Sequence, residues 1–251
     1  MCRQSIMQEE ITTLAKKVCE RIVKDIITGT IAQGQKLNEP ELARIHGISR
    51  GPLREAMSRL ESMRLIIRTP NVGARVVKLS YQELLEIYQI RESLEGLAAK
   101  LAAQAMSSAE KSNLRLLLNS HRKHIRDTQG QSYFQQEGDV DFHYCIVHGS
   151  KNKRLIDMLA GDLYQLVRMY RYQFSVSSNR PQQALKEHDQ ICSAIEEGDG
   201  ELAEWLMKRH INNARKNIMQ RMQIQSTTQD ENNPWARQLE WAKVLNSVQQ
   251  L

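Results

Sequence analysis

The sequence of 251 residues is poor in several residue types, and each shortage argues against a class of protein. With only 5 prolines, 12 glycines and 5% aromatic residues, it does not fit a turn-rich all-β fold. Its four cysteines form no CxxC pair, and no apolar run approaches the roughly 18 residues of a membrane span. The first ten residues lack the basic start and the apolar stretch of a secretory signal. We therefore expect a mainly α-helical protein in the reducing cytoplasm, without a membrane partner.

Positive charge is distributed unevenly along the chain. Residues 1–80 hold 14 Lys or Arg against 8 Asp or Glu, whereas the remaining 171 residues hold 21 of each. The whole net charge of +6 therefore lies in the first third. A basic module joined to a neutral one indicates that the first module binds a polyanion such as nucleic acid. Random unevenness of a solvated surface is the alternative.

The first third of the sequence predicts three helices. Apolar residues spaced by four mark the first helix, which ends at Gly29. A short second helix is capped by Asn38 and ends at Gly47, where a left-handed backbone costs glycine little. Ser49 caps the third helix. Two short helices joined by a glycine turn are typical of a helix-turn-helix.

The region that follows the third helix completes a winged helix. Two β-branched runs, 65–69 and 74–78, flank a turn and predict a hairpin. On the third helix Arg50 and Arg54 lie one turn apart, where guanidinium groups can reach guanine O6 and N7 in the major groove. The Ser49 hydroxyl suits a phosphate. For either arginine, a solvated surface charge is the alternative.

These segments resemble the GntR superfamily of bacterial transcription regulators. The resemblance rests on residues 48–56, which read ISRGPLREA, and on the wing sequence GARV that begins at Gly73. It implies that Arg50 and Arg54 read bases, that Ser49 binds a phosphate and that Gly73 approaches the minor groove.

The remainder of the chain predicts an all-α bundle of about six helices. A capping box at residue 80 opens a long first helix, and further helices are expected over 109–127, 132–149, 153–175, 181–197 and 200–222. The expected domains are thus a winged helix-turn-helix over 1–79, a helical domain over 80–222, and a polar tether with an extra helix over 223–251. Because the linker at residue 80 is short, a rearrangement of the bundle can move the DNA-binding module.

Three of the seven histidines, with one aspartate, form a pattern that suits a metal site. Asp139 and His143 lie one helical turn apart, on the same face. His188 and His210 lie at equal distances before and after Asp199, so they face each other if their helices form an antiparallel hairpin. Hydrogen-bonded core histidines are the alternative. The other four are predicted at or near the surface: His46, His121, His124 and His148.

This half of the chain resembles the FCD ligand-binding domain of FadR-type GntR regulators. The similarity covers residues 91–95, 139–143, 187–188 and 209–211. It implies a divalent metal bound by Asp139, His143, His188 and His210. Zinc, nickel, manganese and iron all suit such mixed oxygen and imidazole ligation.

An anionic effector requires a cationic partner beside the metal. Arg91 and Arg168 are the residues we select, with Tyr170 and Arg171 as further candidates. Pairing of these arginines with carboxylates of the bundle is the alternative. The stretch 133–172 resembles regulators of propionate breakdown by the 2-methylcitrate route, which implies a tricarboxylate such as 2-methylcitrate as effector.

We therefore expect a homodimeric repressor that binds a palindromic operator and responds to a small carboxylate bound at its metal. A metal-dependent enzyme using the same Asp and three His is one alternative, but the sequence offers no convincing nucleophile, no HExxH and no glycine-rich phosphate loop. A non-specific nucleic-acid-binding protein with a structural metal is the other alternative.

Overall fold

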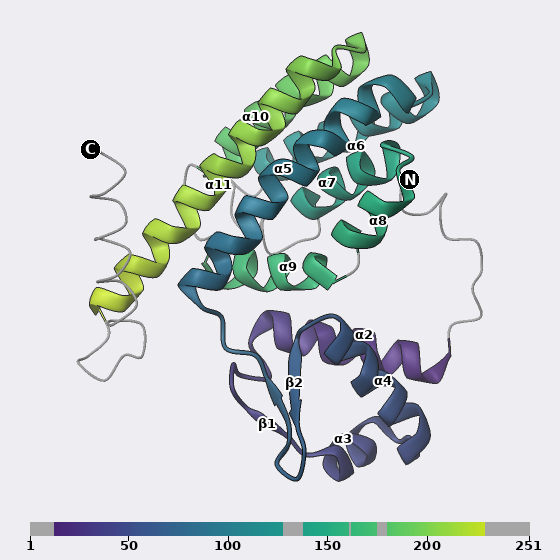
Figure 1. Ribbon diagram of the computed structural model, residues 1–251, viewed down its shortest axis with the longest axis vertical. Helices are drawn as coiled ribbons and strands as arrows, with labels where there is room; N and C mark the ends of the chain where they lie inside the picture. The colour runs from purple at the N-terminus through teal and green to yellow at the C-terminus, as the bar shows by residue number, and fades with distance from the viewer. Residues whose placement is uncertain (1–12, 128–137, 161, 175–179, 229–251) are drawn as a thin grey trace.

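The computed structural model describes residues 13–127, 138–160, 162–174 and 180–228. Figure 1 shows a small N-terminal module below a larger bundle of helices. The elements of the N-terminal module are α2 (Leu14–Thr28), β1 (Lys36–Leu37), α3 (Glu39–His46), α4 (Arg50–Ser62), β2 (Ile66–Thr69) and β3 (Gly73–Val76). The mainly α architecture with an N-terminal winged helix-turn-helix, as expected from the sequence, is confirmed.

Local sequence signals set the ends of the helices in this module. The Asn38 side chain accepts a hydrogen bond from the Glu41 N–H, and Pro40 occupies the first turn of α3. Gly29 and Gly47 follow α2 and α3 in the left-handed conformation, with φ of 81° and 62°. The helices and the sheet enclose a common core, whose fully buried members include Ile22, Ile26, Leu53, Leu60 and Leu65.

The sheet contains one strand that the sequence did not predict. β1 pairs antiparallel with β3, which also pairs with β2, so the strand order is β1-β3-β2. A strand of two residues is too short to show an alternation of apolar and polar side chains, which explains why the pattern missed it. The extra strand places Lys36 opposite Arg75 of the wing.

The helical bundle follows directly after the wing. Within the described residues it consists of α5 (Tyr81–Ala105), α6 (Ser108–Asp127), α7 (Gly138–Gly149), α8 (Lys153–Ala160), α9 (Asp162–Phe174), α10 (Arg180–Glu197) and α11 (Gly200–Thr228). None of the described helices combines the length and the apolar sequence that crossing a membrane requires.

Two expectations for the bundle are wrong. Residues 153–175 do not form one helix but two, α8 and α9, with Gly161 between them in the sequence. Residue 161 itself lies outside the described residues. The last helix also continues past residue 222 to Thr228, because residues 223–228 contain neither Gly nor Pro. The start of the helix expected over 132–149 and the extra helix before residue 251 lie outside the described residues.

The longest helices, α5 and α11, lie side by side (Figure 1). Gly96 of α5 allows this close approach, since a Cβ at that position would lie 2.8 Å from Cγ of Lys208. Small residues continue the buried face of α5 at Ala99 and Ala103. Together with α7 and α10, which pack against them, these helices form the part of the bundle that holds the histidines described below.

Candidate DNA-binding surface and metal centre

The start of α4 presents the residues that the sequence assigned to DNA binding. Ser49 is the N-cap residue of α4, and its side chain makes no capping hydrogen bond. Arg50 and Arg54 are exposed, and within the described part of the chain neither forms an ion pair. Arg59, by contrast, is bonded to Glu55 at 2.9 Å. The two unpaired arginines thus retain their full hydrogen-bonding capacity for a ligand.

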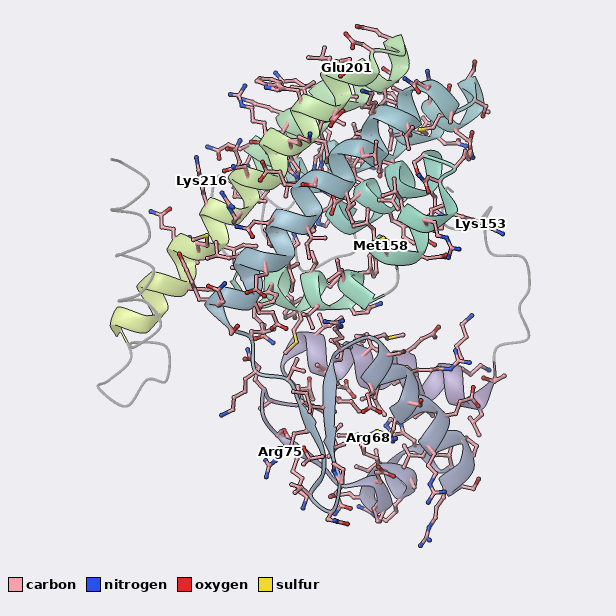
Figure 2. The ribbon with its side chains drawn as sticks, viewed as in Figure 1. Arg68, Arg75, Lys153, Met158, Glu201 and Lys216 are labelled. Carbon is pink, nitrogen blue, oxygen red and sulfur yellow. The ribbon has the colours of Figure 1, made fainter. Side chains whose placement is uncertain are left out.

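The wing supplies a second exposed basic surface. Gly73 begins β3 with φ of 101°, a conformation that favours glycine, and it lies beside the side chain of Lys36. Figure 2 shows Arg75 projecting outward from the sheet. Arg68 lies instead near Glu39 and Glu61, at 3.6 and 3.8 Å. The tip of the hairpin and α3 lie at the end of the module that is farther from the bundle (Figure 1).

Three buried histidines from three helices converge inside the bundle. His143 comes from α7, His188 from α10 and His210 from α11. The Nε2 atom of His210 lies 3.2 Å from Nε2 of His143 and 3.2 Å from Nε2 of His188. Their exposed fractions are 7%, 0% and 1%, so no bulk solvent competes for these nitrogen atoms. Phe142 stacks on the ring of His188 with a centroid distance of 4.1 Å and holds its orientation.

Two carboxylates orient the outer sides of these rings. Glu95 lies 2.7 Å from Nδ1 of His143, and Glu187 lies 2.6 Å from Nδ1 of His210. A carboxylate at Nδ1 selects the tautomer that carries the proton there, which leaves Nε2 with a lone pair directed at the centre of the cluster. No sequence signal pointed to this role of Glu95 or Glu187, although Glu187 directly precedes His188.

Burial keeps two of the three histidines, His188 and His210, neutral. It lowers the pKa of His210 to about 3, although Glu187 opposes the shift. Burial, followed by His210 and His143, holds the pKa of His188 well below its usual value. Burial opposes ionisation of Glu187, but hydrogen bonds from His210 and Arg180 lower its pKa to about 2. Neutral imidazoles beside ionised carboxylates are the protonation states that metal binding needs.

The geometry of the three nitrogens fits a divalent ion. Nitrogen ligands about 2.0–2.1 Å from an ion lie about 2.8–3.4 Å apart for angles between 90° and tetrahedral. The Nε2 separations of His210 from His143 and from His188, both 3.2 Å, fall in this range, and all three ligand atoms lie within 4.8 Å of one another. Asp139 lies in the first turn of α7, one turn before His143, but its side chain is outside the part that the structure describes. The His143, His188 and His210 triad can therefore hold a metal.

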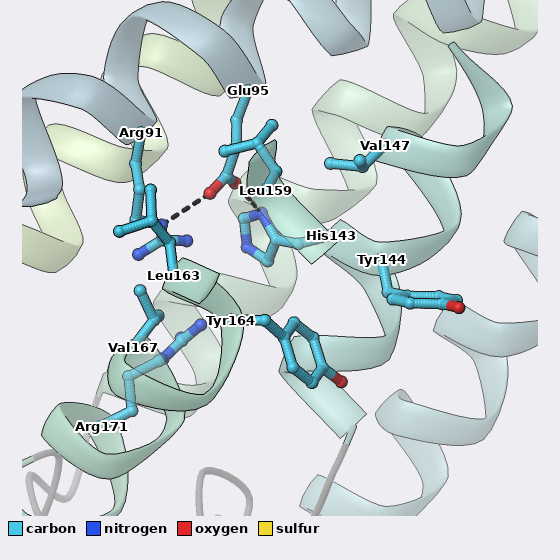
Figure 3. Close-up of a pocket in the computed structure, with 10 residues that line it drawn as sticks. All are labelled: Arg91, Glu95, His143, Tyr144, Val147, Leu159, Leu163, Tyr164, Val167 and Arg171. Carbon is cyan, nitrogen blue, oxygen red and sulfur yellow. Dashed lines mark hydrogen bonds and ion pairs between the residues drawn. The ribbon is translucent and has the colours of Figure 1, made fainter. Parts of the chain in front are cut away.

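A cavity adjoins the triad at His143 (Figure 3). Arg91 of α5 and Arg171 of α9 line it at the polar end, and Arg91 donates to Glu95 at 2.6 Å. Arg168 is not among the lining residues: its guanidinium donates to Gln165 and lies over the ring of Tyr164. Arg171, one of the further candidates from the sequence, is the arginine of α9 that lines the cavity.

His121 was expected at the surface or its boundary, and this expectation is wrong. Its exposed fraction is 5%, and burial, aided by His124, lowers the pKa of His121 to about 4. His121 shares the inner face of α6 with Leu114, Leu118 and Ile125, at helical spacing. The apolar periodicity of α6 therefore contained the signal that His121 faces inward.

Helix α9 joins this cavity to the DNA-binding module. The Tyr170 hydroxyl accepts a hydrogen bond from the Ser80 N–H at 3.0 Å and lies 2.8 Å from the Ser80 carbonyl oxygen. Gln33, which follows α2, accepts from the Leu79 N–H at 3.0 Å and is hydrogen-bonded to Gln173. Tyr170 of α9 thus holds Ser80 directly, and Gln173 of the same helix contacts the Gln33 side chain that holds Leu79.

A winged helix-turn-helix with exposed arginines, attached to a helical domain with a buried histidine cluster, defines the class of DNA-binding regulators that carry a separate helical domain. The chain belongs to the GntR family and carries an FCD domain. Residues 14–76 match the family described as bacterial regulatory proteins, gntR family, and residues 86–213 match the FCD domain.

Named relatives support this assignment. The chain is 30% identical to the "Probable D-xylose utilization operon transcriptional repressor" of Paenarthrobacter nicotinovorans, covering 80% of this chain and 86% of that protein. It is 28% identical to the HTH-type transcriptional repressor RspR of Escherichia coli K12, covering 84% and 89%. The solved structure of E. coli McbR/YncC has the same fold, with a TM-score of 0.71 at 20% identity over 83% of this chain and 98% of that one. The protein is a transcription regulator and not an enzyme, as expected from its sequence.

Proposed function

We propose that this protein is a homodimeric repressor that binds a palindromic operator and is controlled by a small carboxylate bound beside a divalent metal. The observation that carries this proposal is the position of α9, which lines the cavity next to the histidines and also holds the linker to the DNA-binding module. A ligand in the cavity therefore contacts the same helix that positions the winged helix. Control of DNA binding requires only that this ligand prefer one of two arrangements.

On the DNA side, Arg50 and Arg54 are proposed to read bases and Ser49 to bind a phosphate. Gly73 is proposed to approach the minor groove, where Lys36 adds positive charge beside it. One recognition helix per subunit addresses one half-site, so a homodimer matches an operator with two-fold symmetry.

The operator is best identified by incubating the purified protein with fragmented host DNA and sequencing the bound fragments. We expect a single palindromic sequence whose half-sites are centred about 10 base pairs apart, or a multiple of that spacing, and footprinting should protect both halves. A binding curve that falls steeply with salt but shows no preference among fragments would instead indicate non-specific nucleic-acid binding.

On the ligand side, His143, His188 and His210 are proposed to hold zinc, nickel, manganese or iron, with Asp139 as the fourth residue. When bound, the metal supplies an electrophilic centre for an anionic ligand. Arg91 remains one proposed partner of that ligand. Arg171 takes the place of Arg168 in the proposal, because Arg171 lines the cavity.

Communication between the two modules is proposed to depend on Tyr170. Burial, together with Glu83, raises the pKa of the Tyr170 phenol above its usual value, so the hydroxyl keeps its proton. It can then accept from the Ser80 N–H while its proton is shared with the Ser80 carbonyl oxygen and Glu83, at 2.8 and 3.2 Å. Removing this hydroxyl group therefore removes its hydrogen bonds with Ser80 of the linker and leaves the three histidines unchanged.

Replacing Tyr170 by phenylalanine is therefore expected to loosen the linker and to leave the metal content unchanged. The Ser80 N–H loses its acceptor, which costs about 1–3 kcal/mol of stability. Hydrogen exchange of the Ser80 amide should become faster, measured by mass spectrometry of the peptide around residue 80. Tyr172→Phe is the control, since Tyr172 has no hydrogen bond within the described residues. Unchanged exchange in Tyr170→Phe would show that the hydroxyl does not hold the linker.

A further inference from the structure

Two of the three clustered histidines are each connected to a buried arginine through one carboxylate. In the first set, Nε of Arg91 donates to Oε1 of Glu95 at 2.6 Å, and the two residues lie one turn apart on α5. Oε2 of Glu95 lies 2.7 Å from Nδ1 of His143, and the dashed lines in Figure 3 mark both contacts. This Arg–Glu–His unit has the guanidinium on one carboxylate oxygen and the imidazole on the other.

A second Arg–Glu–His unit repeats this order of contacts on other helices. Nη1 of Arg180 donates to Oε1 of Glu187 at 3.0 Å, and Nη2 lies 2.9 Å from Oε2 as an ion pair. Oε2 of Glu187 lies 2.6 Å from Nδ1 of His210. The same arrangement thus occurs twice around one histidine cluster, which an incidental ion pair does not explain.

Arg180 reaches Glu187 along α10. It is the first residue of this helix, and Glu187 follows two turns later. At 1.5 Å per residue the two backbone positions are about 10.5 Å apart along the helix axis, so only a long side chain spans the distance. Arg180 nevertheless has an exposed fraction of only 5%. Because arginine is rarely buried without a paired charge, its contact with Glu187 is what allows this position.

Three contacts fix the orientation of the Glu187 carboxylate. Besides Arg180, Asn213 of α11 donates from Nδ2 to Oε1 at 2.8 Å. Oε1 therefore accepts from two donors, while Oε2 faces His210. The Glu187 side chain is 20% exposed, so water would compete with His210 for a carboxylate that lacked these partners.

The positive charge of Arg180 balances the negative charge that Glu187 brings to the cluster. A largely buried carboxylate is costly without a cation beside it, so an unpaired Glu187 would turn toward solvent. Paired with Arg180, the carboxylate stays at Nδ1 of His210 and keeps the proton on that nitrogen. The lone pair of Nε2 then remains directed at the centre of the triad.

We propose that Arg180 is a positioning residue for the metal centre, which holds Glu187 against Nδ1 of His210 and thereby keeps Nε2 of His210 available to a divalent ion. This inference rests on the proposed function, since it assigns a further residue to the same metal site. A contribution to folding alone is the alternative, because an ion pair within α10 also stabilises the helix.

Nuclear magnetic resonance of the metal-free protein with isotope-labelled histidine nitrogens tests the position of the proton. In wild type we expect His210 to carry its proton on Nδ1, and His210→Asn identifies its signals. Arg180→Met keeps a long side chain without the charge, and it should shift His210 toward the tautomer protonated at Nε2. Unchanged His210 signals in Arg180→Met would overturn the proposal, because the arginine would then have no effect on the ring.

Zinc affinity, measured by competition with a chelator, tests the consequence for metal binding. Arg180→Met should bind zinc about 10-fold more weakly than wild type or worse, since losing an outer partner of a ligand typically costs 10- to 100-fold. Arg180→Lys keeps the positive charge and should retain more affinity.

Arg115→Met is the matched control for the loss of an ion pair on α10. Within the described residues, the hydrogen bonds of Arg115 go to Asp189, Ser193 and Glu196 of that helix and not to the triad. Arg115→Met should therefore bind zinc as wild type does. An equal loss of affinity in Arg115→Met and Arg180→Met would show that Arg180 has only a general structural role.

A double-mutant cycle shows whether Arg180 acts through Glu187. If it does, adding Arg180→Met to Glu187→Gln should lower the zinc affinity by less than about twofold. Losses that multiply would mean that Arg180 acts by another route, and the proposal would be wrong.

Asn213→Ala replaces Arg180→Met in this cycle if the latter does not fold. It removes the other donor to Oε1 of Glu187 and should lower the zinc affinity by about two- to twelvefold. Combined with Glu187→Gln it should cause almost no further loss. Wild-type affinity in Asn213→Ala would contradict the proposal, because the orientation of Glu187 would then not matter to the metal.

The wild-type protein separates this inference from the proposed function. If wild type and Arg180→Met bind zinc equally well, the metal centre stands and the assignment of Arg180 is wrong. If wild type binds no divalent metal, the proposed metal centre is wrong, while the tautomer of His210 in the metal-free protein still shows whether Arg180 controls this ring.

Discussion

Replacing Arg54 by alanine is expected to weaken binding to the operator by about 5- to 150-fold and to relax base preference at one position of each half-site. A bidentate contact between a guanidinium and guanine contributes about 1–3 kcal/mol of discrimination, which corresponds to this range. Arg54 is exposed and forms no ion pair within the described residues, so its loss should change thermal stability by less than about 0.5 kcal/mol. Fluorescence anisotropy with wild-type and mutated operators measures both effects.

Two control variants distinguish base reading from charge. Arg54→Lys keeps the positive charge but loses the planar fork, so it should retain non-specific affinity while losing discrimination between bases. Arg59→Ala removes a positive charge from the same helix at a residue already bonded to Glu55, so it should retain the base preference. If Arg54→Ala discriminated among mutated operators as well as wild type does, Arg54 would not be a base-reading residue.

The DNA-binding module was readily predicted because its signals are local. Caps and glycines fix the ends of its helices within a few residues of sequence, as Asn38 and Gly47 do for α3. The arginine positions follow from those ends, since a helix that begins after Ser49 fixes which side chains face outward. The pairing of β1 with β3 joins residues about 40 positions apart, and no local pattern contains it.

The helical domain was predicted less completely because its site depends on contacts between distant segments. The spacing of His188 and His210 about the turn at Asp199 placed them at the same height, and the structure brings their Nε2 atoms to 3.2 Å. The two carboxylates that orient the rings, Glu95 and Glu187, were not predicted. Glu95 bonds to His143, which lies 48 positions away in the sequence. In a helix with many charged residues, the sequence alone does not distinguish a buried glutamate from an exposed one. Such pairs become visible only when the helices are packed.

Two of these histidines are expected to be essential for metal binding. His210→Asn and His188→Asn are each expected to lower metal affinity by more than about 100-fold, because they remove a ligand atom, and losing an outer partner alone typically costs 10- to 100-fold. Asparagine at position 210 keeps a donor near Glu187, so the substitution removes Nε2 with little loss at Nδ1. The metal content of protein equilibrated with a single metal, measured by elemental analysis, should fall from about one ion per chain in wild type to nearly none in either variant.

Loss of the metal should also lower the free energy of unfolding. A metal present at about 100 times its dissociation constant stabilises wild type by about 2.7 kcal/mol, and this gain should vanish in both variants. His121→Asn is the matched control, since it replaces an equally buried histidine that lies outside the triad, and it should retain both the ion and the stabilisation. Glu187→Gln should fall between these limits, because it keeps all three imidazoles but no longer fixes the tautomer of His210. Full metal content in His188→Asn would mean that the three imidazoles meet as a hydrogen-bonded core cluster, and the sensory role of the domain would then depend on the arginine-lined cavity alone.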